Sequence, residues 1–212
     1  MRLLRIAIAV TLTAGYCLTS RAVYLHAKAE LAGILIHRAW ESTLRDGKPH
    51  PPWSWADTYP VARLRIPRMG YDEIVLEGAT PRTLAFGPAR LFSGADLGAP
   101  GNLEFAGHRD SWFRPLEAIS LGDTIEVQWF DARQRELRER TYAVTTIRVV
   151  APEDVSLLAP TSGDALTLVT CYPFARSPRS PQRFFVRASP VGPSQLAENP
   201  HTSSQAHLYL HP

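Results

Sequence analysis

Apolar and polar residues follow two different patterns along this chain, and the pattern changes near residue 60. Residues 6–18 (IAIAVTLTAGYCL) are almost all apolar, and they follow Arg2 and Arg5. Further on, apolar residues recur at the spacing of one helix face, at Leu31, Ile34, Leu35 and Trp40. This spacing predicts a helix over residues 22–45, which Gly47 and the prolines after it should end.

The apolar stretch near the N-terminus predicts a membrane segment. It is short for a spanning helix, which needs about 20 apolar residues, but an arginine at position 21 can snorkel and so extend the segment to residue 25. A cleaved signal peptide and an uncleaved signal anchor both fit this pattern. No small-x-small cleavage site follows Leu18, and Tyr16 before Cys17 argues against a lipoprotein site. We expect a single-pass signal anchor over residues 1–25 in the inner membrane, with the rest of the chain on the periplasmic side.

Residues 61–188 show a different pattern, with a period of two. Short β-type runs alternate there with Gly/Pro turns, as in VARLRI, NLEFAG, ALTLVT and RFFVRA. This predicts an all-β barrel or sandwich over residues 59–190, with a short helix near residues 111–119. Residues 26–58 then form a juxtamembrane helix and a Pro/Trp-rich linker, and the polar residues 191–212 form a disordered tail.

Composition narrows the possible functions. The formal net charge is +3, from 23 basic and 20 acidic residues, and so balanced a chain does not favour nucleic acid as a partner. The charged run at residues 133–140 mixes both signs, which is typical of a solvated hairpin tip or edge strand. We expect no cofactor and no metal, because no spacing resembles a calcium loop, although Asp72, Glu73 and Asp123 could converge in the fold.

The two cysteines lie in different parts of the chain, so they cannot form a disulfide framework. Cys17 lies in the predicted membrane segment, which leaves Cys171 as a lone thiol in a compartment that oxidises thiols. Cys171 is either a buried apolar residue or a reactive group. It precedes Tyr172-Pro173, where proline should end the strand. A thiol at the rim of the β domain favours the reactive interpretation, since a structural cysteine would more often sit mid-strand.

A reactive thiol needs nearby positive charge and a proton carrier. His108 is the one histidine of the predicted β domain, and it stands where a strand leaves for a turn. Acyl transfer also needs donors aimed at the developing oxyanion. Arg183 and Arg187 share one strand face, and Arg183 begins that strand, so it lies nearer Cys171 if the two strands pair antiparallel.

Residues 167–171 (TLVTC) match the T-L-x-T-C signature of sortases, and the sequence therefore resembles that family. Gly107-His108 before the signature and the run from Arg183 to Arg187 after it fall where the family has its histidine and arginine. The resemblance covers roughly residues 61–188. The stretch Trp53–Leu64 is similar to the sortase branch of Gram-negative bacteria.

The resemblance implies a closed eight-stranded sortase β-barrel, here preceded by a membrane-anchor helix. It also implies cleavage of an LPXTG-like C-terminal sorting signal in secreted proteins, with transfer of the acyl group to an amine acceptor. Cys171 would then form a thioacyl enzyme, His108 would move the proton, and Arg183 would steady the oxyanion. We also expect substrate contacts from Thr170 and Arg187.

Three further interpretations remain open at this point. Asp110, two residues after His108, could orient the imidazole as a triad acid does. A papain-like cysteine hydrolase would use the same Cys–His pair, but its cysteine usually opens a helix and precedes the histidine. A non-catalytic, membrane-tethered β module would instead bind a partner through the aromatic residues 53–59.

Overall fold

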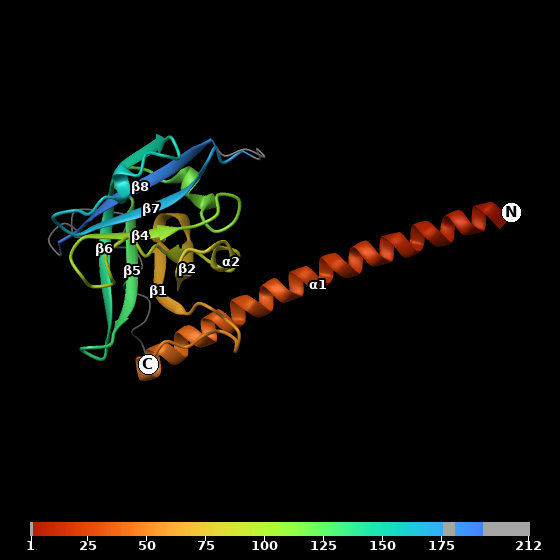
Figure 1. Ribbon diagram of the computed structural model, residues 1–212, viewed down its shortest axis with the longest axis horizontal. Coiled ribbons are helices and arrows are strands. Elements are labelled where there is room, and N and C mark those ends of the chain that lie inside the picture. The colour runs from red at the N-terminus through yellow and green to blue at the C-terminus, as the bar shows by residue number, and fades with distance from the viewer. Residues whose placement is uncertain (1, 176–180, 193–212) are drawn as a thin grey trace, which may run out of the picture.

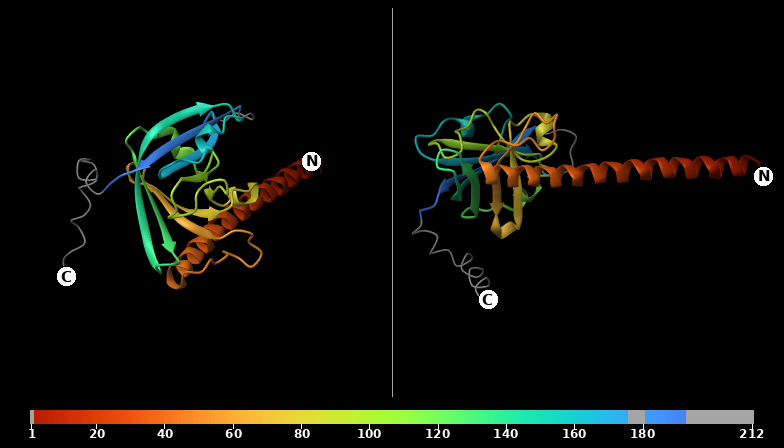
Figure 2. Two further views of the ribbon diagram at one scale, coloured as in Figure 1. Left: turned by 60° about the vertical axis from the view of Figure 1, so that its left-hand side comes forward. Right: turned by 90° about the horizontal axis from the view of Figure 1, so that it is seen from below.

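The computed structural model describes residues 2–175 and 181–192. One long helix, α1 (Arg2–Asp46), runs from the N-terminus to the β domain and includes the stretch predicted as a helix. Its N-terminal half projects away from the β domain in both views (Figure 1, Figure 2). Among the described residues, no helix combines the length and the hydrophobicity that crossing a bilayer requires. The signal anchor over residues 1–25 therefore stays a prediction, and the tail from residue 193 lies outside the described residues.

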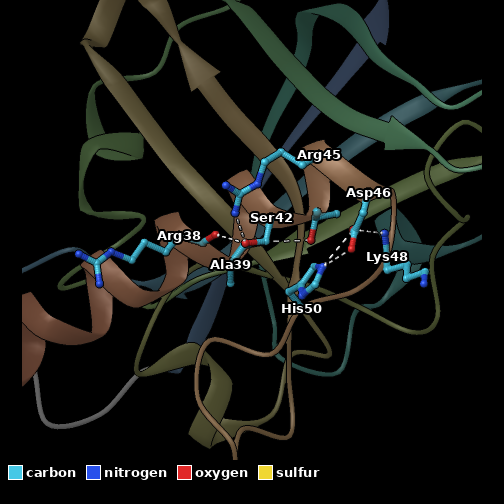
Figure 3. A network of polar contacts seen from close by, with 8 residues as sticks. Arg38, Ala39, Ser42, Arg45, Asp46, Lys48 and His50 are labelled. Carbon is cyan, nitrogen blue, oxygen red and sulfur yellow. Dashed lines mark hydrogen bonds and ion pairs between the residues drawn. The ribbon is translucent and has the colours of Figure 1, made fainter.

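The end of α1 is closed by a small polar network (Figure 3). Gly47 adopts a left-handed φ of 75° and donates its amide to the Thr43 carbonyl at 2.8 Å. Asp46 then accepts the Lys48 amide at 2.9 Å and contacts the His50 ring at 2.9 Å. The Lys48 amide and then the His50 ring lower the pKa of the Asp46 carboxyl. The chain thereby turns back toward the β domain.

The β domain is a closed barrel of eight strands, as predicted. The strands are β1 (Pro60–Ile66), β2 (Tyr71–Glu77), β3 (Ala89–Arg90), β4 (Asn102–Ala106), β5 (Thr124–Asp131), β6 (Glu136–Val150), β7 (Ala165–Tyr172) and β8 (Gln182–Pro190). They close in the order β1-β2-β3-β4-β7-β8-β6-β5. The pairs β2–β3 and β4–β7 are parallel and the others antiparallel.

The connections carry only short helices: η1 (Pro67–Met69), α2 (Pro81–Leu84), η2 (Arg114–Ala118) and η3 (Ser156–Leu158). The helix predicted near residues 111–119 is thus a single 3-10 segment, η2. Its amphipathic pattern is satisfied by burying Leu116 under the barrel end, where Leu116 is 1% exposed.

The period of two separates the barrel interior from its outer face. Interior positions are filled by fully buried aliphatic and aromatic side chains, among them Leu64 of β1, Phe105 of β4, Leu168 of β7 and Val186 of β8. A second apolar cluster joins Ile36 and Trp40 of α1 to Ile74 and Leu76 of β2. The C-terminal part of α1 is therefore packed on the outside of the barrel.

We expect this packing to contribute strongly to stability, and α1 offers a matched pair of isoleucines. Ile36 is 5% exposed and Ile34 is 50% exposed. Ile36→Ala should lower the free energy of unfolding by about 2–5 kcal/mol because it leaves a cavity, and Ile34→Ala should change it by less than about 0.5 kcal/mol. Denaturant unfolding followed by tryptophan fluorescence measures both. Equal effects of the two changes would mean that α1 does not pack on the barrel as described.

Candidate active site

The predicted site residues lie on β7 and β8 and in the turn that follows β4, and these three strands are neighbours in the barrel. In the parallel pair β4–β7, Ala106 lies opposite Val169, and His108 and Cys171 each follow this pair by two residues. The Gly107 amide donates to the Val169 carbonyl at 3.2 Å, which continues the pairing past the end of β4. In the antiparallel pair β7–β8, Arg183 is the direct partner of Cys171. Cys171 and Arg183 therefore lie side by side at one end of the sheet, and the turn that carries His108 begins at the same end.

The sulfur of Cys171 belongs to the outer face of the barrel. Leu166 and Leu168 of the same strand are buried in the interior, so Cys171, which alternates with them, points outward. Cys171 is a free, half-buried thiol, and His108 is exposed in the turn after β4. A strand-end thiol that is neither sealed in the core nor fully solvated is open to an incoming substrate.

The side chains on the outer face of β4, β7 and β8 form three rows that run across the strands. The row of Cys171 is followed by an apolar row of Ala106, Val169 and Phe185, and then by a polar row of Glu104, Thr167 and Arg187. Arg183 and Arg187 thus share one face, as predicted, but they stand at opposite ends of it. Only Arg183 lies beside the thiol.

Two side chains of the polar row, Glu104 and Arg187, form hydrogen bonds with neighbouring loops. Glu104 is fully buried and accepts hydrogen bonds from Ser93 at 2.7 Å and from Asn102 at 2.9 Å. Burial raises the pKa of Glu104, although both hydrogen bonds and the charge of Arg187 act in the opposite direction. Arg187 donates to the Leu157 carbonyl in the β6–β7 connection, and burial lowers its pKa. A substrate contact by Arg187 stays a prediction.

Thr170 is turned toward the barrel interior. It is 3% exposed, and its hydroxyl donates to the Gly107 carbonyl at 2.7 Å. This bond joins the strand of the cysteine to the residue that precedes His108. The structure gives Thr170 a role in joining the two strands, and the substrate contact predicted for it stays a prediction.

Sequence reasoning missed Phe113, which shapes the turn of His108, and it named Gly107 without a structural role. Phe113 is fully buried, and its amide donates to the His108 carbonyl at 2.9 Å. A Cβ at Gly107 would lie 2.7 Å from the Phe113 ring, so only glycine lets the ring pack there. The signal in the sequence was the Gly-His pair itself, because a glycine beside a functional residue often marks a close approach. Asp110 is exposed in the same turn.

The carboxylates considered for calcium lie in separate contacts. Asp72 pairs with Arg63 at 2.5 Å, and Asp123 pairs with Arg68 at 2.5 Å. Burial raises the pKa of the Glu73 carboxyl, and the neighbouring Asp72 adds to this. Within the part of the chain that the structure describes, no three His, Cys, Asp or Glu side chains are grouped as metal ligands.

The sequence matches the sortase domain family over residues 64–191, which is more than half of the chain. The chain therefore belongs to the sortase family, and the prediction of a sortase-type enzyme is confirmed at the level of the family. Sortase D of Bacillus subtilis (strain 168) is 25% identical over 124 residues, which are 58% of this chain and 60% of that protein. The chain thus spans less than two thirds of this relative's length.

Solved structures show the same relationship. Sortase A from Corynebacterium diphtheriae is 31% identical with a TM-score of 0.56, and the match covers 65% of this chain and 63% of that one. A Sortase D5 transpeptidase of Clostridium perfringens has a TM-score of 0.61 at 19% identity, covering 77% of this chain and 99% of that chain, and shows the fold alone. These likenesses do not support the assignment to the Gram-negative branch, which stays a prediction.

A substitution at Gly107 can test whether its close approach to the Phe113 ring fixes the turn of His108. Gly107→Ala should lower the free energy of unfolding by about 1–3 kcal/mol, because the Phe113 ring must move, and it should slow alkylation of Cys171 by displacing His108. Gly163→Ala is the matched control, since a Cβ there meets nothing within 4 Å. Thermal unfolding and iodoacetamide labelling measure the two effects. If Gly107→Ala behaves like the control, the turn does not depend on this contact.

Proposed function

We propose that this protein is a membrane-anchored cysteine transpeptidase that cleaves a C-terminal sorting signal in secreted proteins and transfers the acyl group to an amine. The observation that supports this most directly is the pairing of Cys171 of β7 with Arg183 of β8, with His108 in the turn that follows β4 at the same end of the sheet. A nucleophile, a proton carrier and a cation would then be close enough to act together on the outer face. Membership of the sortase family supports the same chemistry.

The reaction follows from the three side chains. The Cys171 thiolate attacks the scissile carbonyl carbon, and the carbonyl oxygen gains negative charge beside the Arg183 guanidinium. His108 gives a proton to the leaving amine as the C–N bond breaks, which leaves a thioester. The acceptor amine then loses a proton to His108, attacks the thioester and releases the Cys171 thiolate as the C–S bond breaks. Histidine suits this exchange because it titrates near neutral pH.

A cysteine hydrolase would use the same first step and let water take the acyl group. The placement of Cys171 at the end of β7, rather than at the start of a helix, favours the transpeptidase. The non-catalytic binding module would rely on the aromatic segment 53–59. Trp53 packs edge-on against Phe86 with ring centroids 5.0 Å apart, while Trp55 is 81% exposed. The row at Cys171 would have no role in such a module.

The membrane part of the proposal is supported by the sequence and by the shape of the chain. The projecting half of α1 (Figure 2) exposes large apolar side chains at Leu4, Ile8, Leu12, Tyr16 and Leu18. Arginines precede this stretch, as expected for a segment inserted with its N-terminus inside. The barrel would then stand on the periplasmic side of the inner membrane, where secreted substrates pass.

The nucleophile can be tested with a library of peptides that carry LPXTG-like motifs, with and without hydroxylamine. Cys171→Ala should abolish both cleavage and the thioacyl adduct seen by intact-mass spectrometry. The melting temperature should change little, because the thiol buries little apolar area. Cys17→Ala is the control and should retain full turnover. Turnover that persists in Cys171→Ala would exclude the proposed chemistry, and faster product formation with water than with hydroxylamine would favour the hydrolase.

The two arginines of β8 should differ in a matched pair of changes. Arg183→Lys should lower kcat by about 100-fold or more, because a point charge cannot replace the guanidinium donors at the oxyanion. Arg187→Lys should leave kcat within a few fold and mainly lower thermal stability, since Arg187 holds the Leu157 carbonyl. Steady-state kinetics and thermal unfolding separate these outcomes. The reverse pattern would assign the catalytic role to Arg187.

A further inference from the structure

Arg109 in the turn of His108 and Arg114 at the start of η2 contact the chain that follows Cys171. Arg109 Nη1 donates to the Pro173 carbonyl at 2.8 Å, and Arg114 Nη1 donates to the Phe174 carbonyl at 2.5 Å. These carbonyls belong to successive residues, two and three positions after the thiol. Hydrogen bonds from a charged donor are about twice as strong as neutral ones. The turn of the histidine is therefore bound to the exit of the cysteine strand at two adjacent points.

The carbonyls that accept these bonds are held firmly. Phe174 is 5% exposed, and its ring packs edge-on against Phe184 of β8 with centroids 5.0 Å apart. Tyr172 lies against both rings. The segment 172–174 is thus fixed by aromatic packing at the end of the barrel, and it offers the two arginines a rigid support.

The other side of the turn is held by one bond from β7 and by one bond within the turn. The Gly107 carbonyl accepts the Thr170 hydroxyl, and the His108 carbonyl accepts the Phe113 amide. Residue 107 is thus bound to the cysteine strand before the thiol, and residues 109 and 114 are bound after it. His108 lies between these attachments, and its side chain reaches out from a backbone that is held on both sides.

We propose that Arg109 and Arg114 are positioning residues that fix the imidazole of His108 relative to the sulfur of Cys171. This inference rests on the proposed function, because it assumes that the two groups exchange a proton during catalysis. The arginines act through His108 and do not contact the reacting atoms. Without them the turn keeps its attachment at Gly107 but loses the two that lie beyond the thiol.

The test compares the double variant Arg109→Gln/Arg114→Gln with wild type. We expect kcat for a sorting peptide to fall about 10- to 100-fold, with a smaller change in KM, because small displacements of a catalytic group cost this much. We also measure the rate of Cys171 alkylation by iodoacetamide against pH. The profile of the double variant should shift toward that of His108→Ala, a change that a purely structural role would not produce.

Two controls isolate the arginine–carbonyl bonds. Arg63→Gln/Arg138→Gln removes the same charge from β1 and β6, which do not pair with β4 or β7. Glu117→Gln removes the carboxylate that pairs with Arg114 Nη2 at 2.9 Å and leaves the bond to Phe174 in place. Both controls should keep the kcat and the alkylation profile of wild type.

The outcomes separate this inference from the proposed function. A folded double variant with wild-type kcat and profile overturns the positioning role. If the double variant fails to fold, the single variants Arg109→Gln and Arg114→Gln replace it, and wild-type behaviour of both overturns the inference equally. If wild type cleaves no peptide, the proposed function fails, but the alkylation profile still decides whether the arginines set the His108–Cys171 pair.

Discussion

The parallel pairing of β4 with β7 is the constraint on which the site depends. Parallel neighbours leave a sheet at the same edge, so the residues that follow β4 and those that end β7 meet there. The antiparallel β8 begins at that edge and brings Arg183 to the thiol. If β4 were antiparallel to β7, His108 would leave the sheet at the end opposite to Cys171. The register matters as much as the order, because a slip of one residue would turn Cys171 into the barrel interior.

The interior packing of β7 therefore protects the chemistry on its outer face. Leu166 and Leu168 are fully buried, and they can occupy the core only if Thr167, Val169 and Cys171 point outward. The apolar row of Val169 and Phe185 then separates two polar rows on that face. At one end Arg187 stands near the buried Glu104 and holds a loop carbonyl. At the other end Arg183 lies beside a thiol.

The sequence was sufficient to predict features that depend on local periodicity. The β runs, the place of Cys171 at a strand exit and the position of Arg183 at the start of β8 follow from the period of two and from Pro173. Features that depend on contacts between distant parts of the chain could not be predicted from the sequence. β3 is only two residues long, and its parallel pairing with β2 has no local signature. Glu104 interrupts an apolar strand, and only the fold shows that Ser93 and Asn102 satisfy its carboxylate.

The same three side chains would serve a hydrolase and a transpeptidase equally well, so the preference between water and an amine must arise from the connections around the thiol. Two connections are bound to the barrel by partly buried polar contacts, one beside the thiol and one at the opposite end of the outer face. The β6–β7 connection is held where the Leu157 carbonyl accepts donors from Asn102 and Arg187. The start of the β7–β8 connection is held by Arg109 and Arg114. In the proposed transfer, a wall fixed beside the thiol would hold an acceptor amine in line with the thioester. The segment after Cys171, held by Arg109 and Arg114, is the connection placed to form such a wall.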